Sequence, residues 1–168
     1  LDLDAPVVEL WPEFGQHGKA HVTTRMMLDH SAGVPALRDK VKDDGPYDWA
    51  YMTGRLADEE PFWVPGTRNG YHGFTFGWTV GEMVRRASGT SLGTFFQDEV
   101  AKPLGLEFWI GLPEEIEPRV APILPHVYKA EDMKTPFLLD LGTNKQSPAA
   151  LFFFNVGAWR TGGANTRA

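Results

Sequence analysis

Residues 70–89, GYHGFTFGWTVGEMVRRASG, carry the clearest helical pattern in the chain. Apolar side chains recur along this stretch as they do on one face of a helix: Phe76, Val80, Met83, Val84 and Ala87. Gly89 follows them, and glycine commonly ends a helix because it adopts the left-handed backbone conformation without strain. The stretch therefore predicts a helix over residues 75–87. Just before it, the Asn69-Gly70 pair favours a tight turn.

Upstream of this helix, two more are expected. Thr23 can cap a short helix, with Gly33 supplying a left-handed residue at its end. After a strong turn, residues 47–57 are expected to form a helix with Tyr47 and Tyr51 facing inward.

Downstream, a second apolar pattern predicts a helix that Pro103 and Gly105 close: Leu92, Phe95, Phe96 and Val100. Residues 108–110, Phe-Trp-Ile, are interpreted as a short strand. Trp78 and Trp109 are expected in the core, because large aromatic residues at such positions are usually buried. Arg85 and Arg86, beside a glutamate, are expected on a solvated helix face.

The composition is that of one globular domain. With 168 residues, 42% of them hydrophobic and 23% charged, the chain is long enough for one core and too short for two large domains. Prolines recur through the second half and divide it into short helices and loops. The predicted fold class is mainly α with minor β.

Charge and cysteine content exclude several functional classes. The net charge of −6, without any Lys/Arg-rich run, argues against nucleic acid and against an anionic membrane surface as partners. No apolar stretch is long enough for a membrane span, and the longest, residues 149–154, is interpreted as a buried strand or helix segment. The absence of cysteine excludes disulfides, thiolate metal ligands and a cysteine nucleophile, and favours a cytoplasmic location.

Self-contained catalytic motifs are missing. The sequence has no Ser-x-x-Lys, no Gly-x-Ser-x-Gly, no phosphate-binding Gly-x-x-x-x-Gly-Lys and no His-Glu-x-x-His. No two of its five histidines stand at metal-ligand spacing on an expected helix. Neither a metal nor a cofactor is therefore predicted.

Several strings, taken in order, nevertheless resemble the β-lactamase-like serine hydrolases, which include class C β-lactamases, penicillin-binding peptidases and family VIII carboxylesterases. The resemblance extends over essentially the whole chain, and the strings that carry it are residues 22–35, 63–67, 70–72, 75–78, 81–86, 88–89, 91–92, 95–96, 103–106 and 108–113. The Tyr-His pair before Thr-Phe-Gly-Trp, and the later Phe-Trp-Ile-Gly-Leu-Pro, are most similar to the carboxylesterase branch.

This resemblance implies which part of the fold the chain represents. In the family, the nucleophilic Ser and its Lys lie on a helix before the segment that resembles residues 1–6, and a third catalytic element follows the helix expected near Asn165. Residues 1–168 are thus expected to be a partial domain, the helical portion of the α/β β-lactamase/transpeptidase-like fold, without its nucleophile helix or most of its sheet. Tyr71 is the one catalytic residue that it implies here, and this chain alone is expected to be inactive.

The implied reaction is acyl transfer through a Ser acyl-enzyme, with Tyr71 as general base. A Tyr next to a Lys ammonium is biased towards phenolate, which can accept the Ser proton. Three neighbours are expected to bind substrate: Trp63, His72 and Gly73, the last standing where class C β-lactamases carry an Asn that holds the lactam amide. Its absence favours simple esters.

Other functions stay open at this level. The alternatives are a β-lactamase or D-Ala-D-Ala peptidase-like enzyme, and a non-catalytic binding module on the same scaffold. The expected partner is a small-molecule ester or amide. If the sheet is missing, uncovered apolar faces would also favour self-association.

Overall fold

The computed structural model describes residues 1–124, 127, 129, 131 and 134–157. In chain order its helices, with η marking 3-10 helices except for the π-helical turn η4, are η1 (Val7–Glu9), η2 (Pro12–Gly15), α1 (Thr24–Leu28), η3 (Gly45–Tyr47), α2 (Trp49–Asp58), α3 (Thr75–Ser88), α4 (Leu92–Phe96), η4 (Gln97–Ala101), α5 (Lys102–Leu104), η5 (Glu114–Arg119), α6 (Pro136–Thr143) and α7 (Pro148–Phe154). Over these residues the only β pairing is one antiparallel bridge between Pro6 and Thr23. The predicted fold class, mainly α with minor β, is confirmed.

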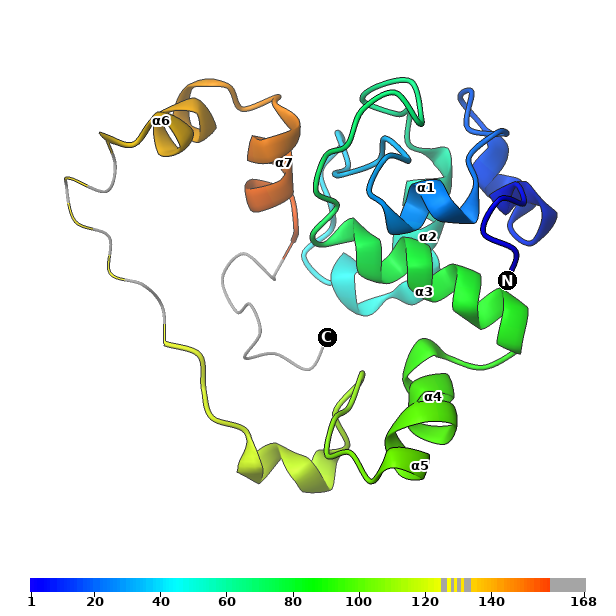
Figure 1. Ribbon diagram of the computed structural model, residues 1–168. Coiled ribbons are helices and arrows are strands. Elements are labelled where there is room, and N and C mark those ends of the chain that lie inside the picture. The colour runs from blue at the N-terminus through cyan, green and yellow to red at the C-terminus, as the bar shows by residue number, and fades with distance from the viewer. Residues whose placement is uncertain (125–126, 128, 130, 132–133, 158–168) are drawn as a thin grey trace.

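Helices α1, α2 and α3 form the body of the structure, and helices α4, α5 and α6 lie away from it (Figure 1). Helices α1, α2 and α3 gather with the N-terminal segment, and the chain then leaves through α4 and α5 (Figure 1). Of the described helices that come later in the chain, α6 lies away from the body and α7 lies beside it (Figure 1). None of the described helices is long and apolar enough to cross a membrane.

Two clusters of buried apolar side chains hold the body together. The larger joins the N-terminal segment, α1 and the chain after it to α2 and α3: Val7, Trp11, Phe14, Val22, Met27, Ala32, Val34, Ala57 and Met83. The second lies around α2 and α3: Leu37, Val41, Met52, Leu56 and Trp78. Trp78 is buried as predicted. Removal of this apolar surface from water is the main favourable contribution to folding.

Helix α1 begins as predicted and ends differently. The Thr23 side chain caps it by accepting a hydrogen bond from the Met26 N–H at 3.3 Å. At its other end His30 has a positive φ of 65°, and the Ser31 N–H donates to the Met26 carbonyl at 2.9 Å. His30 is therefore the left-handed residue of a Schellman-type end, and the assignment of that role to Gly33 is wrong. Gly33 lies further on, where an added Cβ would stand 2.8 Å from the Trp63 carbonyl oxygen.

Helix α2 confirms a helix in this region but corrects its start. Asp48 caps it by accepting from the Tyr51 N–H at 2.9 Å, so Tyr47 lies before the helix. Tyr47 is exposed, and the prediction that it faces inward is wrong. Tyr51 is half-buried, and its hydroxyl accepts a hydrogen bond from Arg55 Nη1 at 2.7 Å.

Helix α3 has the predicted extent but buries a different face. Its buried residues are Thr75, Trp78, Thr79, Gly81, Glu82 and Met83. Of the predicted apolar face only Met83 is buried, and Ala87 is exposed. Polar side chains can lie inside because each one is paired: Thr75 Oγ1 donates to the Val34 carbonyl at 2.8 Å. Gly89, with φ 76°, ends the helix as predicted.

The predicted helix after α3 is present as α4, η4 and α5 in succession, and it ends at Gly105. Residues 108–110 form no strand and pair with none in the described chain, so the predicted strand is wrong. Trp109 is half-buried and belongs to neither core cluster. An extended segment needs a neighbouring strand to become a ladder, and the described residues supply none.

Candidate active site

Tyr71 lies on the link between the 61–70 loop and α3, and its side chain is 74% exposed. Its ring meets the His30 ring edge-on, with centroids 5.1 Å apart, and lies 6.3 Å from the Phe152 ring. The Tyr71 ring therefore lies next to two other aromatic rings, while most of the residue is open to solvent.

The segment carrying Tyr71 is fastened to the chain that follows α1. The Asn69 side-chain amide donates to the Asp29 carbonyl at 2.7 Å, and the Gly70 N–H donates to the His30 carbonyl at 3.1 Å. Earlier in the same loop, the Gly66 N–H donates to the Ser31 carbonyl at 3.0 Å. The predicted loop is thus an ordered one, because its backbone groups find partners in a single neighbouring segment.

His72 is buried, with only 2% of its surface exposed. Its Nε2 accepts a hydrogen bond from the Val34 N–H at 3.0 Å, so the ring proton is on Nδ1, which lies 2.5 Å from the Gly70 carbonyl oxygen. Burial, which penalises the charged imidazolium, lowers the pKa of His72 from 6.5 to about 4. Both ring nitrogens of His72 are therefore hydrogen-bonded to backbone groups, and the buried ring connects the Tyr71 segment to Val34.

A pocket of about 670 Å³ opens beside Tyr71, and its lining is almost entirely apolar. It brings together residues from the 61–71 loop, the start of α3 and the returning α6 and α7: Pro35, Trp63, Gly70, Tyr71, Phe74, Phe137, Pro148, Ala149, Phe152 and Phe153. Trp63, one of the predicted substrate-binding residues, forms part of the wall, and its Nε1 donates to the Ser31 carbonyl at 3.3 Å. The predicted His72 does not line it.

Gly73 lies behind Tyr71, where the Phe152 ring comes close. A Cβ added at Gly73 would stand 2.5 Å from Phe152 Cζ and 2.9 Å from Tyr71 Cε1. Real Cβ atoms do not approach other atoms this closely, so any side chain here would displace one of the two rings. Gly73 thus lies beneath the Tyr71 and Phe152 rings, which line the pocket, and does not line the pocket itself.

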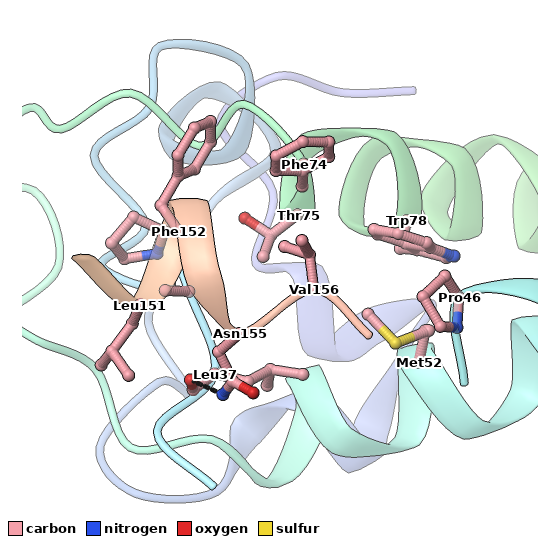
Figure 2. Close-up of a pocket in the computed structure, with 12 residues that line it drawn as sticks. Leu37, Pro46, Met52, Phe74, Thr75, Trp78, Leu151, Phe152, Asn155 and Val156 are labelled. Carbon is pink, nitrogen blue, oxygen red and sulfur yellow. Dashed lines mark hydrogen bonds between the residues drawn. The ribbon is translucent and has the colours of Figure 1, made fainter. Parts of the chain in front are cut away.

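Helix α7 is held against the body by Asn155. Its Nδ2 donates to the Leu37 and Asp39 carbonyls at 2.7 and 2.8 Å, and its Oδ1 accepts from the Val41 N–H at 2.9 Å. Figure 2 shows Asn155 beside Leu37 below α7, with Phe152 on the other side of the helix. A small cavity of about 20 Å³ remains at this junction. The Phe152 ring packs on Phe74 at 4.9 Å between centroids.

Sequence reasoning missed two parts of the site. His30 was interpreted only as part of a helix end, and its left-handed φ cannot be read from a residue type that seldom adopts one. The contributions of α6 and α7 were missed because the 149–154 run was interpreted as core. It is helical, but Phe153 and Phe154 are exposed. The density of aromatic residues in this run was the available signal.

Metal ligands do not gather in this site. Over the described part of the chain, no three His, Asp or Glu side chains are grouped as a metal ion would need.

Comparison with known proteins agrees with this picture. The family model named Beta-lactamase matches residues 1–158. The chain is similar to the esterase/beta-lactamase LipL of Mycobacterium tuberculosis (strain ATCC 25618 / H37Rv), with 37% identity over 126 residues, which are 74% of this chain and 29% of that protein.

Solved structures give the same result. A family VIII carboxylesterase is 43% identical with a TM-score of 0.72, over 74% of this chain and 35% of the other. A penicillin-binding protein homologue from Caulobacter crescentus is 38% identical with a TM-score of 0.72, over 74% and 34%. EstA from Arthrobacter nitroguajacolicus Rue61a is 32% identical with a TM-score of 0.66, over 90% and 45%. The chain spans less than half of each of these proteins, and what it shares with them is the helical part of their fold. It belongs to the β-lactamase-like serine hydrolases.

Proposed function

We propose that this chain is the Tyr-bearing helical part of a serine carboxylesterase. The observation that carries the proposal is the position of Tyr71, whose exposed phenol lies on the rim of an apolar pocket. The backbone N–H groups of the residues before and after Tyr71 are both hydrogen-bonded to His30. The named relatives include an esterase/beta-lactamase and a family VIII carboxylesterase, which supports this choice of reaction.

In the proposed reaction Tyr71 moves a proton twice. A serine hydroxyl from a part of the protein outside residues 1–168 attacks the ester carbonyl, and the Tyr71 phenolate takes its proton. The C–O bond to the alcohol then breaks, and Tyr71 returns the proton to the departing alkoxide. A lysine ammonium, also from outside residues 1–168, favours the phenolate. Water attacks the acyl-enzyme by the same route.

The pocket favours an ester over a β-lactam amide. Its rings provide an apolar surface for an acyl or alkoxy chain, while burying an amide without partners is unfavourable. Gly73 has no side chain with which to hold an amide, and the Phe152 ring fills the space behind it. For these reasons we place β-lactamase or peptidase activity second.

Tyr71→Phe in the full-length protein is the direct test. We expect kcat for p-nitrophenyl butyrate to fall by about 10²–10⁴-fold, because the proton acceptor is removed while the ring is kept. Tyr47→Phe, which changes another exposed tyrosine, should leave kcat unchanged. The 168-residue chain alone should hydrolyse the ester no faster than its own Tyr71→Phe variant.

Three outcomes would contradict the proposal. Wild-type turnover by the Tyr71→Phe protein would remove Tyr71 from the mechanism. Faster hydrolysis of nitrocefin than of the butyrate ester would favour a β-lactamase instead. Absence of Ser-x-x-Lys from the full-length sequence would favour a binding module on this scaffold.

A further inference from the structure

His30 holds the Tyr71 residue from both sides of its backbone. The Gly70 N–H, which precedes Tyr71, donates to the His30 carbonyl at 3.1 Å. The His72 N–H, which follows Tyr71, donates to His30 Nδ1 at 3.2 Å. The two peptide N–H groups that flank Tyr71 are thus bound by one residue. Because both bonds are short-range and directional, they fix the position of the Tyr71 Cα.

The His30 ring also supports the Tyr71 side chain. Its centroid lies 5.1 Å from that of Tyr71 in an edge-on arrangement, 5.6 Å from that of His72 and 4.8 Å from that of Phe76. The ring is therefore packed between the residue after Tyr71 and the first turn of α3. Such aromatic contacts restrict the directions in which the phenol can point.

The backbone of His30 has a positive φ, which is uncommon for residues other than glycine, although histidine adopts it more often than most. Its φ is 65°, and a non-glycine residue in this region persists only where its surroundings hold it there. Glycine would take this conformation without strain, yet it would provide neither the Nδ1 acceptor nor the ring. In this backbone conformation, both the carbonyl and the ring of His30 contact the segment that carries Tyr71.

We propose that His30 is a positioning residue for Tyr71, which orients the phenol for proton transfer without touching the substrate itself. This inference rests on the proposed function, in which Tyr71 is the general base. Proton transfer requires the phenol oxygen within hydrogen-bond reach of its donor, so a displacement of about 1 Å is enough to slow it severely.

The test is a set of His30 variants in the full-length protein, assayed with p-nitrophenyl butyrate. His30→Gly relieves the backbone and removes ring and acceptor, so kcat should fall about tenfold or more while KM stays within about twofold. His30→Asn should keep kcat within a few-fold of wild type, because Asn places Oδ1 where His has Nδ1 and tolerates a positive φ. His30→Gln, with its acceptor one atom further out, should be much slower than His30→Asn.

His17→Gly is the matched control. His17 also has a positive φ, of 52°, but its ring faces Asp58 rather than the Tyr71 segment. This variant should keep the wild-type kcat. Thermal melting of every variant separates loss of fold from loss of position.

A second measurement does not depend on activity. In the full-length protein with 13C-labelled tyrosine rings, the Tyr71 signal is assigned by its loss in Tyr71→Phe. It should shift or broaden in His30→Gly and stay near its wild-type position in His30→Asn.

The outcomes separate the two proposals. If Tyr71→Phe is inactive while His30→Gly keeps the wild-type kcat and the wild-type Tyr71 signal, the role of His30 is wrong and Tyr71 stands. Equal kcat values for His30→Asn and His30→Gln would also contradict it. If Tyr71→Phe remains active, the general base is wrong, and the Tyr71 signal alone then decides whether His30 positions that ring.

Discussion

The neutral imidazole of His72 connects the segment that carries Tyr71 to the interior of the protein. His72 accepts from the Val34 N–H and donates to the Gly70 carbonyl, so it can satisfy both only while one nitrogen lacks a proton. Protonation of Nε2 would turn the acceptor into a donor that faces another donor. The site therefore depends on a residue that never meets the substrate in our proposal.

Acid should destabilise the protein through this residue. The pKa of His72 is about 4 when folded, below its ordinary value of 6.5, so the unfolded chain binds more protons between these values. Stability should be fully present above pH 6.5, fall as the pH drops towards 4, and lose about 3 kcal/mol over that window. Urea unfolding at pH 4, 5, 6 and 7 measures it.

The control is a comparison of pH slopes. His72→Gln removes the titrating group and should flatten the fall between pH 6.5 and 4, whatever its effect at neutral pH. His21→Gln, at an exposed histidine, should leave the slope as in wild type. A His72→Gln protein with the wild-type slope would show that another group causes the acid sensitivity.

At the scale of elements, α3 is anchored by a buried carboxylate. Glu82 is 2% exposed, and its oxygens accept from Trp49 Nε1 at 2.7 Å and from both Arg85 and Arg86. Burial alone would raise the pKa of Glu82, but these hydrogen bonds outweigh it and lower the pKa to about 2. Arg85 and Arg86 thus pair with a buried carboxylate. The prediction of a solvated helix face is therefore wrong for Glu82.

Glu82→Gln should destabilise the fold by about 3 kcal/mol. The neutral amide cannot pair with two guanidinium groups, and breaking one side of a buried ion pair is among the most costly substitutions. Glu13→Gln is the matched control, since Glu13 also pairs with Arg86 at 3.0 Å but is exposed, and it should change stability by less than about 1 kcal/mol. Denaturant unfolding at pH 7 gives both values. Equal effects of the two variants would contradict the anchoring role.

The sequence predicted the elements better than their faces. The bounds of α3 and the Thr23 cap depend on local signals, and both were correct. The buried face of α3 was not, because the partners of Glu82 include Trp49, which is 33 residues away, as well as the neighbouring Arg85 and Arg86. The strand expected at residues 108–110 was wrong for a similar reason, since strands depend on partners that a local pattern does not reveal.

For the candidate site too, the sequence predicted the part that depends on local motifs and missed the part that depends on distant segments. Tyr71 came from an ordered set of motifs, and the structure leaves its catalytic role a proposal while placing it on a pocket rim. The far wall of that pocket comes from Phe137, Phe152 and Phe153, more than 60 residues further along the chain. No local pattern could join such distant segments. Self-association through exposed apolar faces and a cytoplasmic location stay predictions.

At the scale of the whole molecule, Asn155 attaches α7 to the 37–41 segment of the body. Asn155→Ala would remove one hydrogen bond each from the Leu37 carbonyl, the Asp39 carbonyl and the Val41 N–H, although the Asp39 carbonyl keeps its bond from Arg55 Nη2. We expect amide hydrogen exchange in α7 to become at least tenfold faster, with exchange in α3 unchanged. Asn144→Ala, at an exposed position after α6, should leave both unchanged. Uniform acceleration throughout the protein would mean that Asn155 supports the global fold rather than the attachment of α7.

The return of α7 separates two properties that many enzymes build from one loop. The phenol and its fastenings belong to residues 29–76, whereas the opposite side of the cavity belongs to residues 136–154. Phe152 of the later segment lies against the Tyr71 ring, whereas Phe137 packs on Phe153. Under the proposed function, substitution of Phe137 can therefore reshape the space for an acyl chain without removing a ring that lies next to Tyr71. If the proposed function holds, selection can change the preference among esters through residues such as Phe137 while the proton transfer at Tyr71 is retained.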